Sequence, residues 1–89
     1  MTEREVVITN RAGLHTRPAS MIVREAADYD AEFLIRKDGY EINGKSIIGV
    51  MTLAAEQGAT LVLVLDGDDE EEAADALAGL FEDGFGEAK

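Results

Sequence analysis

The chain has 89 residues, 46% of them hydrophobic, with no cysteine and a formal net charge of −11. This length leaves room for one hydrophobic core, so we expect a single domain over residues 1–89, and a field this negative argues against binding of nucleic acid or of an anionic membrane. Because the chain lacks cysteine, shows no signal sequence and contains no apolar run near the roughly 18 residues that cross a bilayer, we expect a soluble, cytoplasmic protein.

The first half of the chain predicts a strand, a helix and a hairpin. Residues 5–9 form a short β-branched run, which favours a strand. Pro18 then begins a segment whose apolar side chains recur at helical spacing: Ala19, Ile22, Val23 and Ala26. Residues 33–35 and 40–42 predict two further strands. The Asp-Gly pair at 38–39 favours a type I′ turn between them, because both central positions of that turn need a positive φ.

The second half predicts helix, strand and helix. Ser46 stands in the N-cap position before a short apolar helix over 47–53, which Gly58 helps to end. The continuous apolar run 61–65 has the length of a strand. The acids at 68–72 occupy the first turn of a final helix, where they favour its positive end, and that helix has one apolar stripe: Ala73, Ala76, Leu77, Leu80 and Phe81.

The element order is therefore β-α-β-β-α-β-α. Helices interleaved with a hairpin predict a two-layer α/β sandwich, in which three helices cover one face of a single sheet. The charge is uneven, since residues 66–89 contain ten acids against Lys89 alone. We interpret this acidic segment as a solvated helix face.

The stretch GYEINGKS, residues 39–46, has the spacing of a phosphate-binding P-loop. A P-loop cradles phosphate in an open nest of backbone N–H groups after a strand. Here residues 40–42 are better used as a hairpin strand, and Glu41 would put a negative charge beside the phosphates. We therefore disfavour an NTP-binding domain, an alternative that predicts a higher melting temperature in millimolar ATP.

The segment GLHTRPAS, residues 13–20, contains the only histidine and the only proline. His15 comes directly before a helix, whose N-terminus favours an anion, and the Arg17 guanidinium suits phosphate oxygens. Because Pro18 has no N–H, the candidate backbone donors are Thr16, Arg17 and Ala19. A neutral imidazole is nucleophilic near neutral pH and forms a labile phosphoramidate, which suits a reversible phosphoryl carrier.

On chemistry alone, another interpretation is at least as strong. His15 could be a cap residue on an ordinary helix, and Arg17 a solvated charge. No second histidine and no cysteine exist to build a metal site, and no serine-histidine-acid set indicates hydrolysis.

Two motifs resemble a known family. GLHTRPAS is similar to the active-site signature of the histidine-containing phosphocarrier proteins (HPr) of the bacterial phosphoenolpyruvate-dependent phosphotransferase system. NGKSIIGVMTLAAEQG, residues 43–58, resembles their second, serine-centred signature, and the resemblance covers essentially the whole chain. It implies an open-faced sandwich, in which three helices cover a four-stranded antiparallel sheet.

The resemblance also implies a function. His15 would accept a phosphoryl group on Nδ1 from phosphorylated Enzyme I and pass it to an EIIA-type domain, and Arg17 and the Thr16 and Arg17 backbone would bind the phosphoryl oxygens. The protein would be a substrate of other enzymes and not a catalyst, with no cofactor. Ser46 resembles a regulatory site for a serine kinase and phosphorylase, although its role as a helix cap needs no kinase.

The same resemblance implies a docking surface for successive partners, made of Thr16, Ser20, Arg24, Lys45, Ile47, Ile48 and Met51. Composition alone would instead place Ile47, Ile48 and Met51 in the core. A regulatory binding protein controlled through Ser46 remains an alternative to the carrier, and it would tolerate loss of His15. We expect a monomer, because a carrier must present one face to several partners.

Overall fold

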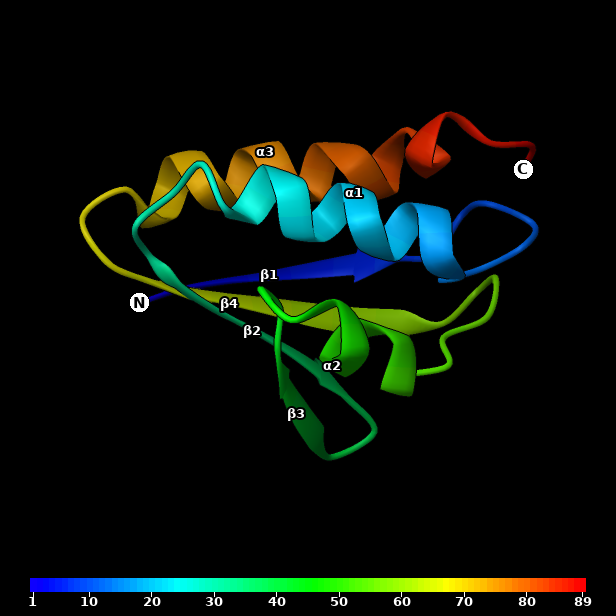
Figure 1. The fold of residues 1–89 in the computed structure, drawn as a ribbon, viewed down its shortest axis with the longest axis horizontal. Coiled ribbons are helices and arrows are strands. Elements are labelled where there is room, and N and C mark those ends of the chain that lie inside the picture. The colour runs from blue at the N-terminus through cyan, green and yellow to red at the C-terminus, as the bar shows by residue number, and fades with distance from the viewer.

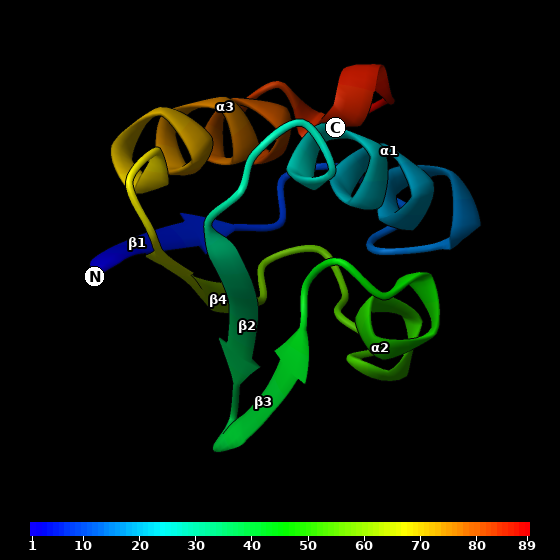
Figure 2. The same ribbon diagram turned by 60° about the vertical axis from the view of Figure 1, so that its left-hand side comes forward.

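The computed structural model describes residues 1–89 as a four-stranded antiparallel sheet with three α-helices on one face (Figures 1 and 2). The strand order is β1-β4-β2-β3, and every neighbouring pair is antiparallel. This confirms the predicted open-faced sandwich and its element order. The elements are β1 (Thr2–Val7), α1 (Thr16–Ala26), β2 (Glu32–Lys37), β3 (Tyr40–Asn43), α2 (Ile47–Thr52), β4 (Thr60–Asp66), α3 (Glu70–Glu82) and a 3₁₀ turn (Gly84–Gly86).

Several element boundaries differ from the predicted ones. β1 begins at Thr2, because its first half pairs with the second half of β4, and it ends at Val7, which pairs with Thr60 at the start of β4. α1 begins at Thr16, two residues before Pro18, and the proline is buried within its first turn. α2 ends at Thr52, and the first left-handed residue after it is Ala54 (φ 48°), ahead of Gly58, which also has a positive φ.

The core lies between the inner face of the sheet and the helices. Phe33 and Ile35 of β2 and the three inward leucines of β4 are almost fully buried. They pack against the apolar stripes of α1 and α3. The apolar residues that alternate along the strands and those that recur at helical spacing therefore form a single core. Phe81 packs edge to face on Phe85, with ring centroids 5.0 Å apart, and this contact fixes residues 83–89 against α3.

The acidic segment is more than a solvated face, so that interpretation was incomplete. The Asp69 carboxylate accepts hydrogen bonds from the backbone N–H groups of Asp30 and Ala31. Glu70 accepts from the Thr2 hydroxyl and pairs with the amino group of Met1. These carboxylates fasten the start of α3 to β1 and to the loop before β2. No helix is both long and apolar enough to span a membrane.

Candidate functional site

The loop between β1 and α1 delivers His15 to the start of a helix. Gly13 has φ 72°, and a Cβ there would lie 2.5 Å from the carbonyl oxygen of Ala55, so only glycine fits. The next residue, Leu14, donates its N–H to that same oxygen at 2.9 Å. The chain then enters α1 with His15 as the N-cap residue in an extended conformation, and its side chain caps nothing. The ring, 43% exposed, is therefore free for other partners.

The imidazole of His15 meets a carboxylate from the other end of the chain. Its Nε2 lies 2.9 Å from both carboxylate oxygens of Glu87, 72 residues away in sequence. Residues 83–89 run beside the β1–α1 loop, where the red end of the ribbon meets the blue loop and the start of α1 (Figures 1 and 2). Arg11 strengthens this contact, since its N–H donates to the carbonyl of Ala88 at 2.8 Å.

Arg17 shares the same carboxylate. Its Nη1 donates to Glu87 at 3.0 Å and to the carbonyl of Phe85 at 2.8 Å, while Nε and Nη2 make no hydrogen bond within the chain. The guanidinium is thus held at one nitrogen and keeps donors for another anion. Beside it, the backbone N–H groups of Thr16 and Arg17 have no backbone partner. The expectation for Ala19 was wrong, because its N–H donates to the carbonyl of His15.

Asn10 lies beneath the surface and forms a hydrogen bond with the Glu87 carboxylate that His15 and Arg17 contact. Its side chain is fully buried, and Nδ2 donates to Glu87 at 3.0 Å and to the Gly13 carbonyl at 2.9 Å. The hydrogen bond from His15, aided by those from Asn10 and Arg17, lowers the pKa of Glu87 below its usual value of 4.5 against the opposing effect of partial burial. The carboxylate therefore stays charged beside the imidazole.

The GYEINGKS stretch forms no phosphate nest. Residues 40–43 are β3, paired with β2, and a Cβ on Gly44 would lie 2.3 Å from the ring of Phe33. Lys45 points away and donates its Nζ to the carbonyl of Tyr29 at 2.7 Å. Gly44 thus allows close packing against Phe33, and the stretch does not form the loop that an NTP site requires.

Ser46 is the N-cap of α2, as predicted, since its Oγ accepts the N–H of Gly49 at 3.1 Å. This bond occupies one lone pair of the hydroxyl and leaves the side chain partly exposed at the helix start.

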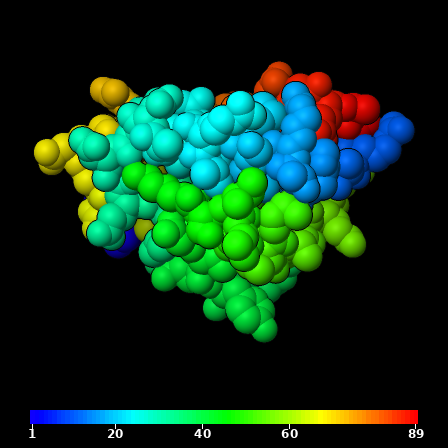
Figure 3. Space-filling model, viewed as in Figure 1, coloured from blue at the N-terminus to red at the C-terminus, as the bar shows by residue number.

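The apolar residues of α2 lie at the surface, so placing them in the core was wrong. Ile48 is 74% exposed, and Ile47 and Met51 are each 39% exposed. Val50 is the one buried residue of the helix. This also settles which isoleucine points outward more. α1 and α2 lie side by side on the face shown in Figure 3. The expected docking residues come from these two helices and from the turn before α2: Thr16, Ser20, Arg24, Lys45, Ile47, Ile48 and Met51.

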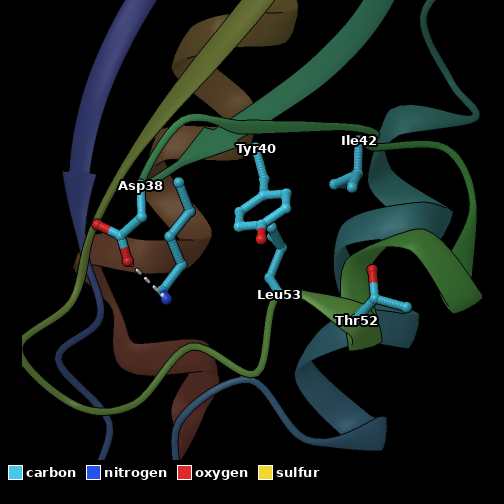
Figure 4. A pocket seen from close by; sticks show the side chains of 6 residues that line it. Asp38, Tyr40, Ile42, Thr52 and Leu53 are labelled. Carbon is cyan, nitrogen blue, oxygen red and sulfur yellow. Dashed lines mark hydrogen bonds and ion pairs between the residues drawn. The ribbon is translucent and has the colours of Figure 1, made fainter.

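A separate hollow of about 280 Å³ lies between β3 and the end of α2 (Figure 4). Its lining residues are Lys37, Asp38, Tyr40, Ile42, Thr52 and Leu53. The only charged pair drawn there, Lys37 with Asp38 at 3.1 Å, is internally satisfied. None of the six residues belongs to the site at His15, and nothing in the hollow suggests a reaction.

Comparison with known proteins identifies the class. Residues 2–83 match the family model described as PTS HPr component phosphorylation site. The chain is 41% identical to the phosphocarrier protein HPr of Xylella fastidiosa over 98% of both chains. It is 43% identical to the HPr-like protein Crh of Halalkalibacterium halodurans, over 92% of this chain and 98% of that one. The crystal structure of HPr-C-His from Thermoanaerobacter tengcongensis superposes with a TM-score of 0.95, at 43% identity and full coverage of both chains.

The chain therefore belongs to the HPr family of phosphocarrier proteins of the phosphotransferase system, which confirms the resemblance seen in its two motifs. Sequence reasoning missed Asn10, Phe85 and Glu87. No local pattern marks them, because they reach His15 and Arg17 only through the folding back of residues 83–89.

Proposed function

We propose that the protein accepts a phosphoryl group on Nδ1 of His15 from phosphorylated Enzyme I and passes it to an EIIA-type domain. The observation that carries this proposal is the position of His15. Its ring is partly exposed at the N-terminus of an 11-residue helix, next to a guanidinium with unused donors. In this role the protein is a substrate of phosphotransferases and not a catalyst itself.

The transfer step needs a nucleophile and compensation for charge. The lone pair of Nδ1 attacks phosphorus as the bond to the donor breaks, and the electron pair of that bond leaves with the donor. The Nε and Nη2 donors of Arg17 and the N–H groups of Thr16 and Arg17 bind the phosphoryl oxygens, helped by the helix dipole. Transfer to the acceptor reverses these changes.

The proposed docking surface is the face shared by α1 and α2. Ile47, Ile48 and Met51 form a small exposed apolar patch, and Arg17, Arg24 and Lys45 contribute positive charge near it. Exposed apolar side chains together with positive charges on the same two helices and the turn before α2 suit a transient complex with an acidic partner surface.

The first test is the intact mass after incubation with Enzyme I and phosphoenolpyruvate, for the wild type and His15→Ala. We expect one acid-labile phosphoryl group on the wild type and none on the variant. If an Enzyme I verified as active and cognate modifies neither protein, the carrier function is wrong.

A second candidate, regulation through Ser46, rests on two observations. The Ser46 hydroxyl is accessible at a helix N-cap, where a phosphate is tolerated by the dipole, and two relatives carry the name HPr-like protein Crh. Incubation with a serine kinase of this pathway, comparing wild type with Ser46→Ala, tests it. An acid-stable phosphate confined to the wild type would support regulation, whereas no incorporation would exclude it for that kinase.

We also propose a monomer, which size-exclusion chromatography with light scattering can test. Similar chains have been solved as dimers, namely HPr of T. tengcongensis and Crh of Bacillus subtilis. A mass of twice 9.6 kDa would reject the monomer.

A further inference from the structure

We infer that Glu87 is a positioning residue for phosphoryl transfer, which fixes the tautomer of His15 and stabilises the charge that the ring acquires. The inference rests on the proposed function, and it adds a residue that lies 72 positions from His15 in sequence. It starts from the direct contact between the Glu87 carboxylate and the imidazole.

The first step concerns the proton on the ring. A neutral imidazole carries one N–H, on either Nδ1 or Nε2. Both oxygens of Glu87 lie 2.9 Å from Nε2, and an ionised carboxylate can only accept hydrogen bonds. The hydrogen must therefore be on Nε2, which leaves the nucleophilic lone pair on Nδ1.

The second step concerns charge during the reaction. When Nδ1 bonds to phosphorus, Nε2 keeps its hydrogen, so the ring changes from neutral to cationic and no proton leaves. The positive charge develops in a ring whose Nε2–H already donates to Glu87. Because this hydrogen bond strengthens as the donor becomes cationic, the carboxylate stabilises the transition state more than the ground state.

The third step concerns Arg17, which can bind Glu87 and the incoming phosphoryl group at the same time through different nitrogens. Only Nη1 of Arg17 contacts Glu87 and the Phe85 carbonyl. The carboxylate thus anchors the guanidinium at one nitrogen, and Nε and Nη2 remain for the phosphoryl oxygens. Substitution of Glu87 would therefore release only Nη1, which transfer does not require. It would also leave the guanidinium of Arg17 less firmly positioned.

Asn10 fixes the carboxylate in turn. Its buried Nδ2 donates to Glu87 and to the carbonyl of Gly13, in the loop that delivers His15. The side chain of Glu87 is only 16% exposed, so the contact with the ring is built into the packing and is not a chance surface pair. The arrangement is a carboxylate-imidazole pair, in which the acid orients the base.

The test compares Glu87→Gln with the wild type in two measurements. The first is the ¹⁵N chemical shifts of the neutral His15 ring in the unphosphorylated protein, which report the tautomer and need no partner enzyme. We expect Nε2–H to predominate in the wild type. The variant should show a mixed population, because a glutamine amide can donate to Nε2 as well as accept from it. A wild-type ring with predominant Nδ1–H, or an unchanged ratio in the variant, would overturn the inference.

The second measurement is the initial rate of phosphorylation by Enzyme I and phosphoenolpyruvate. We expect a loss of about tenfold in Glu87→Gln and partial recovery in Glu87→Asp, which restores a carboxylate. Glu71→Gln removes the same charge from an exposed position at the opposite end of α3, and it should stay within about twofold of the wild type. A rate in Glu87→Gln equal to that of the control would refute the contribution of Glu87 to phosphoryl transfer. If even the wild type takes up no phosphoryl group, the proposed function fails, and the tautomer ratio still decides the role of Glu87.

Discussion

The ring of Phe33 packs directly on the backbone of Gly44, so closely that a Cβ at residue 44 would lie 2.3 to 2.8 Å from three of its carbons. The same two residues are joined by a hydrogen bond of 2.8 Å from the Gly44 N–H to the Phe33 carbonyl. The glycine that gave the sequence its P-loop spacing is therefore part of the core between β2 and the loop before α2.

Gly44→Ala should destabilise the protein by about 1 to 3 kcal/mol, because the added methyl group must displace a buried aromatic ring. Urea unfolding followed by circular dichroism measures this change. Gly79→Ala is the matched control, since Gly79 lies in α3 with nothing within 4 Å of its Cβ position, and it should stabilise the helix by up to about 1 kcal/mol. Equal effects of the two substitutions would contradict this account of Gly44.

Much of the fold could be predicted because its signals are local. The Asp38-Gly39 turn has both residues at positive φ, as its type requires, and Ser46 caps α2 through its own hydroxyl. The start of β1 was missed for a physical reason. Residues 2–4 are polar, with an exposed Glu3, and look like a polar terminus before the predicted strand over 5–9, although they pair with residues 63–65 of β4.

The site was only half predictable. His15 and Arg17 lie two residues apart in a recognisable motif, whereas Glu87 and Asn10 join them through tertiary packing that no sequence period encodes. Similarly, the exposure of Ile47 and Met51 depends on how short α2 is and on Val50 filling the interior, which hydrophobicity alone does not reveal.

Ser46→Ala should lower the free energy of unfolding by about 1 kcal/mol through loss of the N-cap. Ser46→Asp should keep most of that stability, because aspartate caps helices as well as serine does. The added charge should nevertheless slow phosphorylation of His15 by weakening the encounter with an acidic partner. Chemical unfolding and initial transfer rates, measured on both variants, separate the two effects. An unchanged transfer rate in Ser46→Asp would argue against charge as the means of regulation.

Glu70 should make the stability depend on acid pH. The Thr2 hydroxyl, the Met1 amino group and the Gly67 N–H lower the pKa of Glu70 from 4.5 to about 2. Since the folded value is the lower one, the contribution of this carboxylate is fully present above pH 4.5 and is lost as the pH falls toward 2. Glu70→Gln should therefore lower the melting temperature at neutral pH but not near pH 2. Glu71→Gln, in the same helical turn, corrects for the loss of net charge, and the same pH profile in both variants would count against this assignment.

Ile48→Ala should weaken docking without affecting folding. The side chain is 74% exposed, so its truncation leaves the core intact, yet it is the most exposed apolar residue of the proposed docking surface. We expect the KM of Enzyme I for the carrier to rise by about fivefold or more, with an unchanged melting temperature. Tyr40→Ala is an equally exposed control at 74%, on the hairpin that adjoins the separate hollow. A similar change in KM for both variants would mean that the loss of any exposed apolar side chain has this effect, wherever it lies on the surface.

The contacts between residues 83–89 and the β1–α1 loop form late during synthesis of the chain. Asn10, Arg11 and His15 emerge from the ribosome long before Glu87 and Ala88, with which they form hydrogen bonds. A nascent chain that has not yet reached residue 87 contains the histidine without the carboxylate beside it. The arrangement of side chains around His15 is therefore assembled only after residue 87 has been synthesised and residues 83–89 have packed beside the loop before α1.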